Sequence, residues 1–245
     1  MKLPKYLIES KAPPPLTLTS TTQCKLTNHQ ICSYRDSRVI ASLEHYGLLN
    51  TNQIYSLHFS SVSKQMCNRR LRMLVKRKAI KPPGRYSISE PNFYFLDKRP
   101  QSHIEHRLGV NWIVIWFEKY GKRIKGDVIY QVDFEVDYKI IKPDAFLVVQ
   151  ARDKSLWFFF LEFDRAESGN DFGKKVKKYN DLFETGMKSA WWRQHTDGFP
   201  SIYVVTTGSK EKIKKKISEN NRHGLDFQIF SLEWIITQCS KKQGG

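Results

Sequence analysis

Apolar residues begin to recur at helical spacing near Ser37, after a long stretch without any regular period. Val39, Ile40 and Leu43 share one face of the first predicted helix. Gly47 then follows as the expected C-terminal end, because glycine readily adopts the conformation that closes a helix. The pattern therefore predicts that folded structure begins at about residue 36.

Two further helices are expected directly after the first. The run Asn50-Thr51-Asn52 offers N-caps to a short helix, and Ser61 and Ser63 begin a longer one. In that third helix Cys67, Leu71 and Leu74 form one apolar stripe, which predicts a buried face.

A two-stranded ribbon is expected after the third helix. The segments 86–88 and 93–96 are rich in residues that favour strands, and Glu90-Pro91-Asn92 is typical of a turn between them. Three helices followed by a hairpin predict a winged helix-turn-helix domain over residues 36–98.

From Gln101 onward, helical and strand patterns alternate, which predicts an α+β or α/β domain over residues 99–240. The run 157–161 is apolar on both faces and predicts a central strand. The expected helices are 104–120, 172–183, 210–217 and one ending at 236, and the expected strands are 128–138, 145–149, 156–163, 202–206 and 227–230.

Composition and apolar runs indicate the compartment in which the chain is expected. Residues 1–35 are rich in Ser, Thr and Pro and are expected to be a flexible arm. No apolar run approaches the roughly 18 residues that span a bilayer, and no secretory signal is recognisable, so we expect a cytoplasmic protein without a membrane partner. The 4 cysteines are scattered, which favours reduced thiols and no zinc site.

The formal net charge of +17 indicates a polyanionic partner. No acidic residue occurs from Phe59 through Ser89, so the exposed face of the third helix is purely basic, and we expect double-stranded DNA as the partner. Ser63, Lys64, Asn68 and Arg69 are expected to meet base edges. The phosphate contacts are expected from Arg70, Arg72, Lys76, Arg77 and Arg85.

Carboxylates lie at two neighbouring predicted strand ends. Asp144 precedes one strand and Glu162 lies near the end of the next, so the two side chains are candidates for one Mg²⁺ site. Lys175, or its neighbours Lys174 and Lys178, would assist phosphodiester chemistry beside such an ion. Spacing alone leaves open the alternative that these acidic residues only start a strand or face solvent.

A series of short motifs in this order resembles the replication-relaxation family. The motifs are the predicted winged helix-turn-helix, His106-Arg107-Leu108-Gly109-Val110-Asn111, Pro143-Asp144-Ala145, Phe160-Leu161-Glu162-Phe163-Asp164-Arg165, Lys175 with Tyr179, and 199–206. The resemblance implies a bacterial plasmid or mobile-element protein acting in replication or relaxation, with a second domain similar to PD-(D/E)xK nucleases. It implies a restriction-endonuclease-like mixed sheet flanked by helices, with Asp144 and Glu162 as metal ligands.

The sequence departs from the nuclease pattern at Asp164, which occupies the position where a lysine is expected. Lys175 from the following helix is then the candidate catalytic lysine, with Arg165 as a second cation, and Glu105 is a weaker additional ligand. His106 and Asn111 are expected to hold the first helix of the second domain against the sheet.

Two functions remain open from the sequence. One is a Mg²⁺-dependent endonuclease whose catalytic residues are Asp144, Glu162, Asp164 and Lys175. The other is a non-catalytic transcription regulator or replication accessory whose second domain dimerises or contacts DNA or other replication or transfer proteins. Lysines from 210 to 216 would extend the DNA surface or face solvent, and Trp191-Trp192 fit a core better than a base-stacking site.

Overall fold

The computed structural model describes residues 28–85, 87–123, 128–151, 153–166, 171–186 and 190–241. The described residues from Asp36 onward form one compact unit. Most of the predicted arm, residues 1–27, lies outside the described residues. The fold combines helices with a five-stranded mixed sheet, which confirms the predicted α+β class.

The first three helices follow the predicted caps. Helix α1 (Asn28–Tyr46) begins earlier than the predicted Ser37 and ends before Gly47, whose φ of 75° closes it. Helix α2 (Thr51–Ile54) continues as a π-helix (Tyr55–Phe59), and Asn50 caps it by accepting a 2.9 Å hydrogen bond from the Gln53 amide. Helix α3 (Lys64–Lys76) begins after the predicted cap Ser63.

The predicted ribbon differs from the observed pairing. Strand β1 (Leu49–Asn50) pairs antiparallel with β2 (Phe93–Tyr94), and Gly84 contributes a single bridge to Phe93. The strand predicted at 86–88 is wrong, since residues 87–90 form a turn; Tyr86 lies outside the described residues. The proline pair before Gly84 lacks amide protons, so the ladder ends after one bridge.

The second half of the chain forms the main sheet, in the order β3-β4-β5-β6-β7. Its strands are β3 (Val128–Phe134), β4 (Ala145–Gln150), β5 (Leu156–Asp164), β6 (Ser201–Thr206) and β7 (Phe227–Ser231). The first three run antiparallel, whereas β5, β6 and β7 are parallel. Strand β5 is central, as predicted, while β3 is shorter than predicted because Glu135 adopts a positive φ of 55°.

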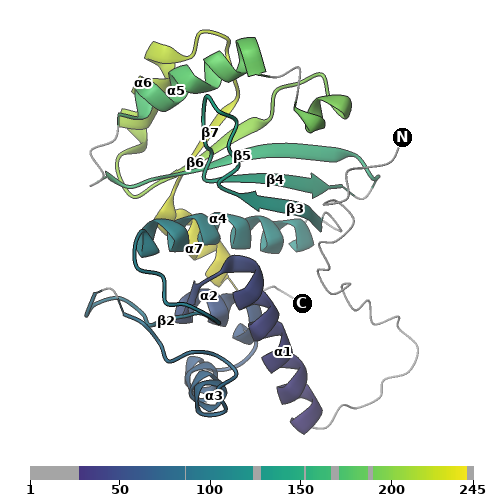
Figure 1. The fold of residues 1–245 in the computed structure, drawn as a ribbon, viewed down its shortest axis with the longest axis vertical. Helices are drawn as coiled ribbons and strands as arrows, with labels where there is room; N and C mark the ends of the chain where they lie inside the picture. Colours follow the sequence, from purple (N-terminus) through teal and green to yellow (C-terminus); the bar gives the residue numbers. More distant parts are fainter. Residues whose placement is uncertain are drawn as a thin grey trace. The chain divides into compact units, whose positions relative to one another are not determined.

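Helices cover both faces of this sheet (Figure 1). One face packs against α4 (Ile104–Arg123) and α7 (Leu232–Ser240), and the other packs against α5 (Phe172–Asp181) and α6 (Lys210–Asn220). A π-helical turn (Leu182–Gly186) extends α5, and a 3₁₀-helix (Trp191–Gln194) precedes β6. Trp192 is fully buried, as the core interpretation predicted.

Helix α4 connects the sheet to the N-terminal helices. One core cluster includes Val39 of α1, Ile113 of α4 and Leu147 of β4. Buried polar bonds reinforce this packing, since Gln53 donates to the Leu108 carbonyl at 2.7 Å and Asn111 donates to the Leu48 carbonyl at 2.6 Å. Asn111 therefore holds α4 against the N-terminal helices and not, as predicted, against the sheet.

Gly109 allows α4 to approach β5 closely. A Cβ atom at this position would overlap the ring of Phe163. The next turn of α4 towards its N-terminus, which carries Glu105 and His106, therefore lies directly over the end of β5.

Candidate functional site

Helix α3 presents a basic face whose apolar side is fully packed. Cys67 and Leu71 are completely buried and Leu74 is nearly so, which orients the remaining side chains outward. The predicted contact residues Ser63, Lys64, Asn68, Arg69, Arg72, Lys76, Arg77 and Arg85 are all exposed. The amphipathic pattern thus produces an exposed surface that combines positive charge with hydrogen-bond donors.

Arg70 differs from the other predicted contact residues. Its guanidinium donates two hydrogen bonds to the Asp36 carboxylate, with distances of 2.6 and 2.5 Å, and its side chain is only 19% exposed. The bidentate geometry fixes α3 against α1. Within the described part of the chain, Arg69 and Arg72 on the same helix form no ion pair of this kind.

A hollow of about 490 Å³ lies beside the basic face. Lys64, Asn68 and Arg72 line it from α3, and Arg85 and Asn92 line it from the segment before β2. Arg85 donates a 3.1 Å hydrogen bond to the Asn92 side chain, which holds this segment in place. The exposed basic groups of α3 and Arg85 thus border one concave surface.

The carboxylates predicted in the second half of the chain do converge. Asp144 directly precedes β4, and its two oxygens contact the His106 ring at 3.0 Å and the Phe163 amide at 2.7 Å. Lys175 on α5 lies 3.8 Å from the same carboxylate. We call the group made by the side chains of His106, Asp144, Glu162, Lys175 and Tyr179 the carboxylate–lysine cluster.

Glu162 lies at the centre of the carboxylate–lysine cluster and is fully buried. One carboxylate oxygen accepts a hydrogen bond from the Lys175 ammonium, and the other accepts one from the Tyr179 hydroxyl at 2.7 Å. Lys175 and Tyr179 are four residues apart on α5, so both point from the same face of the helix into the sheet.

The electrostatic consequences follow from burial and charge. Burial raises the pKa of Glu162 to about 7, although Lys175 and Tyr179 stabilise its charged form. Burial would also raise the pKa of Asp144, but hydrogen bonds from His106 and the charge of Lys175 outweigh it, so that this pKa is lowered. Burial disfavours the charge on Lys175, yet Glu162 and Asp144 raise its pKa overall.

Asp164 and Arg165 lie outside the carboxylate–lysine cluster. Asp164 accepts a 2.8 Å hydrogen bond from Thr206 on the neighbouring strand. Arg165 forms a 2.5 Å ion pair with Glu105 of α4. Two of the predicted site residues, Glu105 and Arg165, therefore bind each other. Glu105 contacts the Arg165 guanidinium and does not join Asp144.

The oxygen atoms of the carboxylate–lysine cluster do not fit a Mg²⁺ ion in this arrangement. Mg²⁺ retains several waters beside its protein ligands. Glu162 is fully buried and both of its oxygens already accept protein hydrogen bonds, while Asp144 is bound by His106 and Phe163. No group of three or more His, Cys, Asp and Glu side chains within the described ranges is arranged to hold a metal ion. The Mg²⁺ site stays a prediction.

Two members of the carboxylate–lysine cluster had weaker signals in the sequence. Tyr179 stands four residues after Lys175, and that spacing was the available indication that both side chains share a target. His106 was expected to support α4, and it does so through Asp144 itself, with its ring also against Phe163.

A family model described as replication-relaxation matches part of the chain. Residues 97–200 match the replication-relaxation family. The match supports the family that the sequence motifs indicated, and it supports a role in replication or relaxation in general. The replication-relaxation region contains Asp144, Glu162 and Lys175, whereas α1, α2 and α3 precede it.

No curated protein and no solved structure matches the chain. Among the described residues, no helix has both the length and the apolar character needed to cross a membrane.

Proposed function

We propose that this chain is a DNA-binding protein of a plasmid or mobile element that acts in replication or relaxation, or in their control. Helix α3 would enter the major groove of duplex DNA as the recognition helix of a winged helix-turn-helix. Lys64, Asn68 and Arg69 at its N-terminal half would meet base edges, and the basic residues further along would reach phosphates.

The observation that carries this proposal is the exposed face of α3, which carries several basic side chains and no acidic one. Its opposite face is anchored by Cys67, Leu71 and Leu74, so the orientation of the exposed side chains is fixed by packing. A helix anchored in this way can present side chains to a groove without reordering.

The pairing of β1, β2 and Gly84 supports the same proposal. It places the turn at 87–90 and the side chain of Arg85 beside α3, around the hollow that α3 also lines. A wing in this position would contact the DNA backbone next to the groove that holds α3.

The test is a footprint on duplex DNA from the plasmid or element that encodes the protein. Arg69→Ala and Lys64→Ala should each lose about 1–3 kcal/mol of specific binding, because each removes a base or backbone contact. Lys154→Ala, exposed on the loop between β4 and β5, is the matched control and should bind normally. Unchanged footprints in both α3 variants would refute the assignment of α3.

The carboxylate–lysine cluster bears on whether the second half of the chain cleaves DNA. Lys175 and Tyr179 donate hydrogen bonds to both oxygens of Glu162. This arrangement favours a nuclease-like domain that binds DNA or protein without cleaving DNA. In this proposal the opposite charges of the carboxylate–lysine cluster neutralise one another, and the cluster holds α4 and α5 against the sheet.

The competing endonuclease hypothesis has a direct assay. The purified chain is incubated with supercoiled plasmid in Mg²⁺ or Mn²⁺, and we expect the plasmid to stay supercoiled. Nicking that requires the metal and disappears in both Asp144→Ala and Glu162→Ala would instead identify the cluster as an active site.

A further inference from the structure

Helices α5 and α6 together carry nine lysines and only three acidic residues. They lie side by side on one face of the sheet, as Figure 1 shows. All of the following lysines of this pair are exposed: Lys174, Lys177, Lys178, Lys212, Lys214, Lys215 and Lys216. We call the surface made by these seven residues the lysine face.

The few acidic residues of the pair have partners of their own. Asp181 binds Arg222 at 3.0 Å, Glu219 lies 3.9 Å from Lys215, and Glu211 accepts a hydrogen bond from Ser209 at 3.1 Å. The contact with Glu219, and a 3.8 Å contact between Lys216 and Asp171, partly neutralise two lysines of the lysine face. The other five leave this surface with an excess of positive charge.

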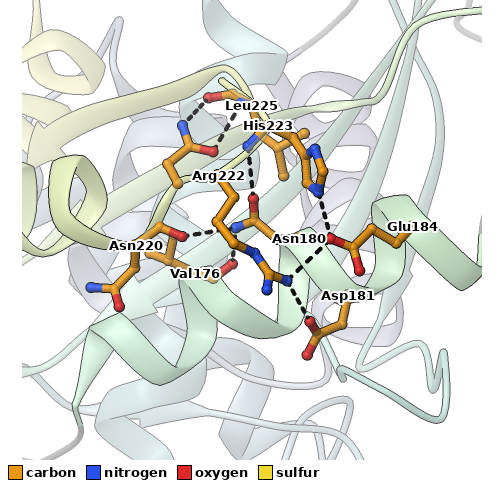
Figure 2. Close-up of polar contacts among 9 residues, drawn as sticks. Val176, Asn180, Asp181, Glu184, Asn220, Arg222, His223 and Leu225 are labelled. Atoms are coloured by element: carbon orange, nitrogen blue, oxygen red, sulfur yellow. Dashed lines mark hydrogen bonds and ion pairs between the residues drawn. The ribbon is translucent and has the colours of Figure 1, made fainter.

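The two helices are held together rigidly at one end, as Figure 2 shows. Asn180 is fully buried, donates to the carbonyls of Val176 and Asn220, and accepts from the His223 amide. Glu184 nearby binds both Arg222, at 3.2 Å, and His223, at 2.6 Å. This network fixes the spacing of the two rows of lysines without using any lysine.

The chemistry of the lysine face fits a phosphate backbone better than a protein surface. Phe172, Val176, Tyr179 and Ile213 are buried under the two helices. Neither α5 nor α6, both fully described, exposes an aromatic side chain, and Phe183 just beyond α5 is 36% exposed and packs against the His223 ring. Protein interfaces are usually centred on aromatic or arginine anchors. Exposed lysines without such anchors can neutralise phosphates without reading bases.

A hollow of about 240 Å³ lies at the edge of the lysine face. Lys212 and Lys216 line it from α6, and Arg165 lines it from the end of β5. Asp164 and Asp171 line it as well, so the hollow carries charges of both signs and marks the edge of the lysine face.

The lysine face and α3 lie on opposite sides of the main sheet. Helices α5 and α6 pack on the core cluster of one face, whereas α3 belongs to the cluster that contains α4 and the other face. Duplex DNA bound by α3 therefore leaves the lysine face available to a different segment of DNA.

We propose that the lysine face is a second, sequence-independent DNA-binding surface, through which one chain bridges two DNA segments. The bridging step rests on the proposed function of α3, but phosphate binding by the lysine face does not. Each lysine that contacts a phosphate would steepen the salt dependence of binding by a log–log slope of about 0.9.

The test compares two charge-matched variants of the full chain. The first carries Lys177→Gln, Lys178→Gln, Lys212→Gln and Lys215→Gln. The control carries Lys98→Gln, Lys139→Gln, Lys142→Gln and Lys154→Gln, which are exposed lysines outside both surfaces.

The readout is capture of a fluorescent duplex by protein held on a second, bead-bound duplex that carries the footprinted site. We expect the wild type and the control to capture the fluorescent duplex. The lysine-face variant should capture at least about tenfold less of it and keep its footprint. Equal capture by the lysine-face variant and the control, or no capture by the wild type, would overturn the proposal.

A separate arm distinguishes failure of the lysine face from failure of α3. In an Arg69→Ala background, nonspecific duplex binding should persist and its salt slope should fall only when the lysine-face substitutions are added. Vesicles containing phosphatidylserine are tested in parallel. Loss of vesicle binding without loss of duplex binding in the lysine-face variant would assign this surface to anionic lipid and overturn the proposal.

Discussion

The Lys119 ammonium donates a 2.6 Å hydrogen bond to the backbone carbonyl of Cys239. Lys119 belongs to α4 and Cys239 to the last turn of α7, where carbonyl groups at a helix C-terminus favour a cation. The same ammonium donates to the Ser56 hydroxyl at 3.0 Å, and that hydroxyl donates to the Cys239 carbonyl at 3.0 Å. The C-terminal helix is thereby tied to the N-terminal helices through one buried lysine.

Replacing Lys119 with Met should destabilise the N-terminal helices together with α7. The substitution keeps the apolar stem but leaves the Cys239 carbonyl and the Ser56 hydroxyl with fewer buried partners, at a cost of about 1–3 kcal/mol. Urea denaturation followed by fluorescence checks this value.

The position of the effect is checked by amide hydrogen exchange. Protection should fall in the π-helix Tyr55–Phe59 and in α7 together, because Lys119 donates to Ser56 and to Cys239. Lys98→Met, on an exposed residue, is the control and should change neither. Reduced protection confined to α7 would contradict the idea that Lys119 joins the two regions.

The charge of Lys175 should be required for stability in a way that the charge of its neighbour is not. Lys175→Met leaves the buried carboxylate of Glu162 without its cation, and breaking a buried ion pair from one side costs about 3–5 kcal/mol. Lys174→Met is the matched control, because Lys174 is exposed on the same turn of α5. Equal free energies of unfolding for the two variants would show that the Lys175–Glu162 contact contributes little.

The raised pKa of Glu162 predicts a specific pH dependence in metal-free buffer. Burial raises this pKa from 4.5 to about 7, so the folded state holds the proton more tightly than the unfolded state. The contribution of Glu162 to stability is therefore complete below about pH 4.5 and is lost as the pH rises through about 7.

The measurement is the difference in free energy of unfolding between the wild type and Glu162→Gln. This difference should fall by about 3 kcal/mol across that pH interval, at about 1.36 kcal/mol per pKa unit. Other titrating groups are common to both proteins and cancel. A flat difference for Glu162→Gln would contradict the burial argument.

The local parts of this structure could be predicted from the sequence. Caps such as Ser63 and the apolar spacing of α3 depend on residues within a few positions, so their prediction succeeded. The approach of Asp144 to Glu162 could also be anticipated, because antiparallel pairing of β4 with β5 sets Ala145 opposite Leu161.

The remaining contacts depend on pairs that are distant along the chain. Strand β2 pairs with Leu49–Asn50 instead of the segment just before it, so a local hairpin pattern predicted the wrong partner. The contact between Lys175 and Glu162 depends on the position of α5 over the sheet, which residue types alone leave undetermined. The bond between Asn111 and Leu48 joins residues 63 positions apart and was expected elsewhere for the same reason.

Arg70 should stabilise the fold, in contrast to the neighbouring Arg69. Its two hydrogen bonds to Asp36 are half-buried and bidentate, which places the pair between an exposed ion pair and a fully buried one. A double-mutant cycle with Arg70→Ala and Asp36→Ala isolates the pair from the other contacts of Arg70, and we expect a coupling energy of about 1–2 kcal/mol.

Arg69→Ala supplies the comparison on the same helix. Its side chain is exposed and contacts Met66, so its loss should change stability by less than about 0.5 kcal/mol. The two arginines should then separate by assay, with Arg70→Ala lowering the urea midpoint and Arg69→Ala lowering DNA affinity. A coupling energy near zero for Arg70 and Asp36 would mean that their ion pair does not hold α3 against α1, and Arg70 would return to the set of candidate DNA contacts.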